Sequence, residues 1–163
     1  HMGVLTEEQV HRIRDLSLVV TTHTNSYIQR IASQLKKRLG PERENDIAPL
    51  KRLCDAGVRF CLATDNQPIS LWGPVWQTIA RQDGETGEIV GPDQALSREE
   101  ALRSATIDGA YLCRDEQNRG SLEPGKLADF VVLDTDPLTV AEDDIKETQA
   151  ELAVVGGKVV FER

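Results

Sequence analysis

The stretch FCLATDNQP, residues 60–68, runs from an apolar strand into an aspartate, two amides and a proline. Side chains alternate between the two faces of a strand, so Asp65 shares a face with the small residues Ala63 and Cys61, while the bulkier side chains point the other way. The bulky face is suited to packing beneath helices, and the small face to the crowded interior of a parallel barrel. Catalytic residues of such barrels lie at the C-terminal ends of the strands. The alternative is an aspartate that only begins a turn.

Upstream of this stretch, helices and strands alternate. The capping-box pattern Thr6–Gln9 and the apolar repeat after it predict a helix over residues 7–16. The β-branched run Leu18–Thr22 predicts a strand, and further helices are expected from Ser26 to about Gly40 and from Ile47 to Gly57. A strand over 58–64 follows. This order favours parallel strands joined by right-handed crossovers, an α/β arrangement.

Downstream, the sequence changes character twice. Residues 66–96 are rich in Gly, Pro and charge, and we expect a long loop with one helical turn near Val75–Arg81. A second capping box at Ser97 predicts a helix through about Leu112. The remaining sequence favours β structure, with a strand over 128–134 and a hairpin around Gly156-Gly157, which lies between two β-branched runs.

Composition excludes several classes of function. The 163 residues carry a net charge of -8 without clusters of Lys and Arg, which argues against nucleic acid and against an anionic membrane surface. No apolar run approaches the roughly 20 residues of a spanning helix. The three cysteines are widely spaced, so we expect reduced, buried thiols in a cytoplasmic protein. His1-Met2 resembles a cloning remnant and is left out of the fold prediction.

Two motifs imitate phosphate chemistry. Residues 120–126 fit G-x-x-x-x-G-K, but Leu127 stands where a phosphate-binding loop needs Ser or Thr, and a strand follows in place of a helix. Glu123–Lys126 is better interpreted as a type II turn. Asp134-Thr135-Asp136 is similarly interpreted as a polar turn ended by Pro137, because too little chain follows it for a central strand of a phosphotransferase.

The histidines offer one candidate for a site. His11 is expected on the solvent face of its helix. His23 leaves the end of the strand at 18–22, so it is either a substrate-site residue or a hydrogen-bonded loop residue; both interpretations stay open.

Four segments resemble, in order, the C-terminal part of the amidohydrolase superfamily, and most closely its metal-dependent amide and imine hydrolases: residues 64–66, 97–110, 120–134 and 154–160. The resemblance implies a metal-bearing eight-stranded barrel followed by a small β-sandwich, with Leu18–Thr22 and Val58–Asp65 as the seventh and eighth barrel strands. The fold class expected is therefore α/β: a partial TIM barrel of two strand–helix units over residues 3–118, then antiparallel segments of a sandwich over 119–163.

By the same resemblance, Asp65 matches the eighth-strand aspartate that binds a divalent metal, zinc or iron, and takes the proton of metal-bound water. A divalent metal lowers the pKa of water from about 15.7 to about 7, and a carboxylate can accept the proton and return it to a leaving amine. The implied activity is hydrolysis of a non-peptide C–N bond of a small molecule by metal-bound hydroxide. His23 is expected to line the substrate side of this pocket.

The sequence lacks the family's first-strand His-x-His, its middle-strand Lys or Glu and its later histidines, whereas a metal site needs three or four protein ligands. We therefore expect a C-terminal fragment that is inactive alone and holds no metal. Two alternatives stay open: a catalytically inactive binding or assembly module, and an enzyme completed by ligands from another chain. Two strands cannot close a barrel, so their unpaired edges predict a homodimer or another homo-oligomer.

Overall fold

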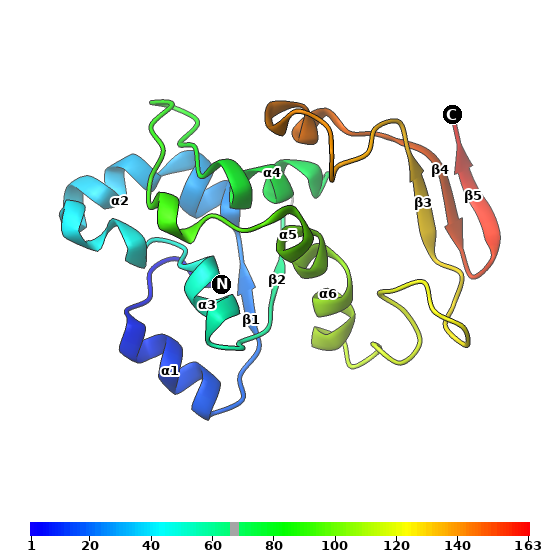
Figure 1. The fold of residues 1–163 in the computed structure, drawn as a ribbon, viewed down its shortest axis with the longest axis horizontal. Coiled ribbons are helices and arrows are strands. Elements are labelled where there is room, and N and C mark those ends of the chain that lie inside the picture. The colour runs from blue at the N-terminus through cyan, green and yellow to red at the C-terminus, as the bar shows by residue number, and fades with distance from the viewer. Residues whose placement is uncertain (66–68) are drawn as a thin grey trace.

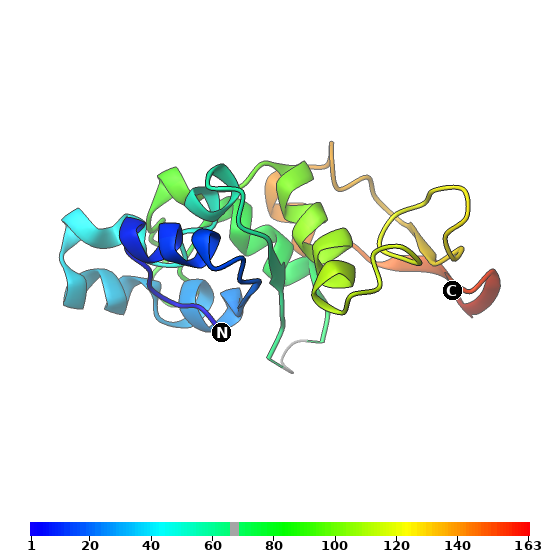
Figure 2. The same cartoon turned by 90° about the horizontal axis from the view of Figure 1, so that it is seen from below.

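A computed structural model describes residues 1–65 and 69–163, so Asn66, Gln67 and Pro68, which end the stretch quoted above, lie outside the described residues. The described chain forms a helix-rich body with a two-stranded sheet, beside which a three-stranded sheet stands apart (Figures 1 and 2). In chain order the elements are α1 (Glu7–Asp15), β1 (Val20–Thr22), η1 (Asn25–Arg30), α2 (Ala32–Leu39), η2 (Pro41–Asp46), α3 (Leu50–Asp55), β2 (Phe60–Leu62), α4 (Trp72–Ala80), η3 (Pro92–Gln94), α5 (Arg98–Ala105), α6 (Ile107–Leu112), β3 (Phe130–Leu133), η4 (Glu142–Glu147), β4 (Ala150–Val155) and β5 (Lys158–Glu162).

The two strands of the body are parallel, as predicted, and the fold is mixed α/β. Val20 lies opposite Phe60 and Thr22 opposite Leu62. Both strands are shorter than expected, because the residues expected to begin them are bonded to the last turns of the preceding helices. The backbone N–H of Leu18 donates to the carbonyl of Ile13 in α1 at 3.0 Å. In the same way, the N–H of Val58 donates to the carbonyl of Leu53 in α3 at 2.9 Å.

Both predicted capping boxes are confirmed. In the first, the Gln9 N–H donates to Thr6 Oγ1 at 3.3 Å and the Thr6 N–H to Gln9 Oε1 at 2.9 Å. In the second, Ser97 and Glu100 exchange the same pair of bonds at the start of α5. Gly57 ends α3 with a positive φ of 72°, a conformation that costs glycine little.

The core lies between β2 and the surrounding helices. Leu50, Leu53, Phe60 and Val75 are almost fully buried and belong to one cluster of apolar side chains. Cys61, which was expected on the small face of the strand and as a buried thiol, is buried. All three residues of β2 are covered.

The exclusion of Met2 from the fold was wrong. Its side chain joins the core cluster and its N–H donates to the carbonyl of Thr21 at 2.9 Å. Thr22 Oγ1 in turn donates to the Met2 carbonyl at 3.3 Å. The first residues therefore run along the free edge of β1.

The segment expected to be a long loop contains a helix, α4, of nine residues. Trp72, Val75, Trp76 and Ile79 follow helical spacing, and all four pack in or against the core. Gly and Pro in its first turn hid this pattern, although Pro is well tolerated there. The helix expected from Ser97 to Leu112 is divided into α5 and α6 at Thr106, whose Oγ1 donates to the Leu102 carbonyl at 2.7 Å.

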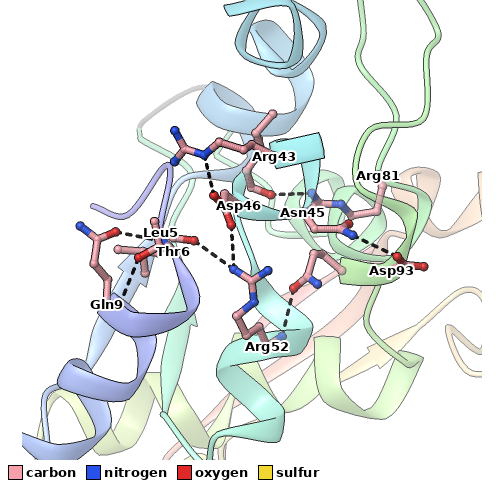
Figure 3. A network of polar contacts seen from close by, with 11 residues as sticks. Leu5, Thr6, Gln9, Arg43, Asn45, Asp46, Arg52, Arg81 and Asp93 are labelled. Carbon is pink, nitrogen blue, oxygen red and sulfur yellow. Dashed lines mark hydrogen bonds and ion pairs between the residues drawn. The ribbon is translucent and has the colours of Figure 1, made fainter. Parts of the chain in front are cut away.

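A polar network ties α1, η2 and α3 together (Figure 3). Arg52 Nη1 donates both to the Leu5 carbonyl at 3.2 Å and to Asp46 Oδ1 at 3.0 Å. Asp46 Oδ2 accepts from Arg43 Nε at 3.0 Å, so one carboxylate holds two arginines. Nearby, Arg81 is buried and donates to three backbone carbonyls, and burial lowers its pKa to about 10.

The three-stranded sheet has the order β3-β4-β5 and is antiparallel, with the predicted hairpin at Gly156-Gly157. Consecutive residues on a strand face opposite sides, and both Val131 and Val132, as well as both Val159 and Val160, are exposed. The described residues therefore cover neither face of this sheet completely.

Both motifs that imitate phosphate chemistry are turns, as predicted. The Lys126 N–H donates to the Glu123 carbonyl at 3.1 Å, and Gly125 has φ 94°, as a type II turn requires. Asp136 Oδ1 accepts from the Leu138 N–H at 2.9 Å.

The three cysteines are free thiols, and their environments differ. Cys61 is buried and Cys54 half-buried, but Cys113 at the end of α6 is exposed, so the expectation of three buried thiols was wrong. Within the described part of the chain, no helix is both long enough and apolar enough to span a bilayer.

Candidate active site at the strand exits

The C-terminal ends of β1 and β2 lie side by side. The ladder continues one step past the strands, where the Ala63 N–H donates to the Thr22 carbonyl at 3.0 Å. Because the strands are parallel, the loops after them leave from the same edge of the sheet. This brings together the two residues that the sequence singled out, His23 and Asp65.

Asp65 presents its carboxylate to solvent. Its side chain is 54% exposed, and its backbone has φ 56°, in the left-handed region that Asp tolerates better than most residues. Among the described residues, the carboxylate accepts no hydrogen bond that would tie it into a turn. The side chain is therefore available to a ligand.

His23 lies beside this carboxylate. Nδ1 of His23 is 3.7 Å from Oδ2 of Asp65, and the imidazole is largely buried. The ring of His1 meets the ring of His23 edge-on, with 4.2 Å between centroids. His23 thus offers a largely buried imidazole, beside the exposed carboxylate that Asp65 offers.

Two amides that the sequence pattern did not single out connect the strand exits to α4. Asn25 Nδ2 donates to the Thr64 carbonyl at 3.0 Å, one residue before Asp65. Asn25 Oδ1 accepts from Gln77 Nε2 at 2.8 Å. Asn25 stands two residues after His23 in a predicted strand exit, so its position was a usable signal, whereas Gln77 lay in the segment interpreted as a loop.

The donor atoms at this edge suit a divalent metal in kind but fall short in number. A carboxylate and an imidazole are ordinary ligands of zinc-like ions, which take three or four protein ligands. Residues 1–65 and 69–163 contain no group of three His, Cys, Asp or Glu side chains placed to hold a metal ion. Asp65 and His23 fit part of a metal site, and further ligands would have to come from elsewhere.

A pocket of mixed charge lies at the opposite end of β2. Cys54, Arg59, Glu100 and Asp108 are among the residues that line a cavity of about 250 Å³. Burial raises the pKa of Asp108, against the lowering effect of two nearby arginines. In parallel barrels, however, chemistry is placed at the C-terminal ends of the strands, and the N-terminal end contributes to stability. The perturbed pKa does not make this pocket a catalytic candidate.

Comparison with known proteins identifies the family to which the chain is similar. The sequence model of the amidohydrolase family matches residues 1–161. An N-substituted formamide deformylase of Arthrobacter pascens is 36% identical over 118 residues, which are 71% of this chain and 21% of that protein. An imidazolonepropionase of Micrococcus luteus is 38% identical over 88 residues, 54% of this chain and 20% of the relative.

A solved structure shares the fold. An uncharacterized metal-dependent hydrolase from Pyrococcus horikoshii superposes with a TM-score of 0.74 at 28% identity, over 88% of this chain and 29% of that one. The chain therefore spans between a fifth and a third of the length of these three proteins. Since the family match covers almost every residue, the chain belongs to the amidohydrolase family.

Proposed function

We propose that the chain is the C-terminal part of a metal-dependent amidohydrolase that hydrolyses a non-peptide C–N bond. In this proposal β1 and β2 are the seventh and eighth strands of a TIM barrel, the sheet β3–β5 is part of a β-sandwich, and the full-length protein is called the parent. The observation that carries the proposal is the exposed carboxylate of Asp65 at the end of a parallel strand, 3.7 Å from His23.

The chain's own residues have distinct roles. Asp65 would hold one ligand position of a divalent metal, zinc or iron, and His23 would line the substrate side. When bound, such a metal supplies a water molecule of lowered pKa. The Asp65 carboxylate accepts a proton at Oδ as the nucleophile forms and returns it to the leaving nitrogen, so that the amine departs neutral.

The substrate class is supported by the relatives. The deformylase and imidazolonepropionase both take their names from small amide or ring C–N substrates. We propose a substrate of this size and chemistry for the parent. The described residues do not complete a metal site, so the 163-residue chain is proposed to be inactive alone.

The test compares the parent with its Asp65→Asn variant. The parent is loaded with zinc or with iron and assayed for formate release from N-substituted formamides and for ring opening of imidazolonepropionate. Asn keeps the shape of the side chain but cannot accept the proton, so turnover should fall about 10²–10⁴-fold. The matched control is Asp136→Asn, because Asn keeps an oxygen that accepts from the Leu138 N–H, and its amide group can donate to the Thr139 hydroxyl, which now donates to Oδ2.

Near-normal turnover of Asp65→Asn would place the base elsewhere and overturn the proposed mechanism. Full activity of the 163-residue chain, with ligands contributed by a second copy, would favour the enzyme assembled from two chains. If the parent is inactive on every substrate and binds no metal, the remaining interpretation is a catalytically inactive binding or assembly module.

A further inference from the structure

We infer that Asn25 and Gln77 are positioning residues that hold the Asp65 carboxylate in its reactive place. The inference rests on the proposed function, because it assigns Asp65 a chemical role. In the described part of the chain, the bonds of these two amides lead to the Thr64 carbonyl and not to the Asp65 carboxylate. They act on the backbone immediately before it.

The first step is the clamp between the two strand exits. Asn25 Nδ2 donates to the Thr64 carbonyl at 3.0 Å, from the exit of β1 to the exit of β2. Within the described residues, the ladder between β1 and β2 ends at the bond from Ala63 to Thr22. The Asn25 side chain thus extends the pairing by one residue and fixes the peptide that leads into Asp65.

The second step is the orientation of Asn25. Gln77 Nε2 donates to Asn25 Oδ1 at 2.8 Å, and this bond determines which end of the Asn25 amide faces Thr64. An amide that rotated by half a turn would point its oxygen at the Thr64 carbonyl oxygen and lose both bonds. Gln77 therefore holds the Asn25 side chain in the orientation in which its NH₂ group donates to the Thr64 carbonyl.

The buried, unpaired side-chain oxygen of Gln77 supports a role of this residue in orienting Asn25. Gln77 is only 4% exposed, and its Oε1 is buried without a hydrogen-bond partner among the described residues. A buried acceptor without a partner destabilises the folded state, because it has lost its hydrogen bonds to water. A chain selected for stability alone would favour an apolar residue at this position of α4. The unpaired oxygen and the nitrogen that orients Asn25 belong to the same side chain, so Gln77 cannot supply the nitrogen without burying the oxygen.

The third step is the conformation of Asp65. Its φ of 56° lies in the left-handed region, which Asp tolerates better than most residues but which still costs more than an ordinary backbone conformation, and such conformations persist where the surroundings determine them. The fixed peptide before Asp65 supplies that constraint. Small displacements of a catalytic group, about 1 Å, can cost on the order of 10² in rate.

The experiment has two arms. In the parent, Asn25→Ala should lower kcat about 10–100-fold with little change of KM, and Gln77→Met should lower it in the same direction by less. The matched control is Gln94→Met, which removes another buried amide whose Oε1 accepts from the Arg52 N–H at 3.0 Å, outside the strand exits. This control should lower stability and leave kcat unchanged.

The second arm needs no activity. In the isotope-labelled 163-residue chain, Asn25→Ala should shift the backbone amide signals of Thr64 and Asp65, and Gln94→Met should leave them in place. Unchanged signals would overturn the positioning itself. Unchanged kcat in Asn25→Ala, in a parent where Asp65→Asn is inactive, would overturn its catalytic consequence. An active Asp65→Asn parent would instead overturn the proposed function, and the spectra would still decide whether the clamp exists.

Discussion

Nδ1 of His23 lies 3.7 Å from Oδ2 of Asp65, so a buried imidazole on the exit of β1 faces an exposed carboxylate on the exit of β2. This distance allows electrostatic attraction when the imidazole is protonated, but it is too long for a hydrogen bond. The two side chains can therefore contact different parts of one ligand, and this separates their expected mutant effects.

His23→Ala in the parent should raise KM more than it lowers kcat, because His23 is expected to contact substrate and not to transfer the proton. Steady-state kinetics of the parent check this. The control is His11→Ala, since His11 lies on the exposed face of α1. If neither constant changes in His23→Ala, His23 is a loop residue and the substrate pocket does not include it.

The 163-residue chain should bind no catalytic metal tightly. Two donor groups at the strand exits are fewer than the three or four that a stable site requires. Elemental analysis after incubation with zinc or iron and gel filtration measures the ratio of metal to protein. A ratio near one metal per chain, abolished by Asp65→Ala, would contradict this prediction.

The carboxylate of Asp83 should make stability depend on pH. Burial raises its pKa, but hydrogen bonds from the N–H groups of Ser33, Thr86 and Glu85 and from the Thr86 hydroxyl outweigh burial and hold the pKa below its usual range. An acid whose pKa is lowered by folding stabilises the protein above its unfolded pKa, about 3.9, and this stabilisation is lost as the pH falls through the folded pKa.

Asp83→Asn should therefore reduce the free energy of unfolding by about 1–3 kcal/mol at pH 7, and the difference from wild type should shrink as the pH falls below about 3.9. Urea unfolding across this range measures both chains. Asp15→Asn, on the exposed end of α1, is the control and should change little. A difference that stays constant with pH would show that the charge of Asp83 is not responsible.

The chain should associate into a two-fold dimer through the sheet β3–β5. Both faces of this sheet expose apolar side chains, and its edge strands have unpaired backbone groups. Sedimentation equilibrium at micromolar concentration should give a dimer mass. Val160→Lys should weaken association, whereas Leu16→Lys, an exposed site on the helical body, should not. A wild-type monomer of 18.1 kDa with a cooperative melt would refute the dimer.

Some features were predictable because their chemistry is local in the sequence. Thr6 and Ser97 begin their helices with the expected reciprocal bonds, and Gly156-Gly157 makes the expected hairpin. The nearness of His23 to Asp65 was also predictable, since parallel strands bring their exits to one edge.

Other features depend on tertiary contacts that no local pattern carries. The helix α4 begins with signals typical of a loop, and it is stabilised by packing Val75 and Trp76 into the core. The bond from Gln77 to Asn25 joins residues 52 positions apart, so it follows only from the way α4 packs against η1. The domain boundary near residue 118 and the roles of Asp65 and His23 stay predictions.

The attachment of η4 to α4 has a consequence for the chain's motions. Ile145 is fully buried in the core and the Lys146 ammonium lies 4.3 Å from the centre of the Trp76 ring, so this short helix holds the strands on either side of it to the body. Apart from this helix, few contacts between described residues join the strands β3, β4 and β5 to the helical body. Their backbone amides should exchange with solvent deuterium through local opening, at rates nearly independent of denaturant, whereas the amides of β1 and β2 should exchange only when the whole body unfolds.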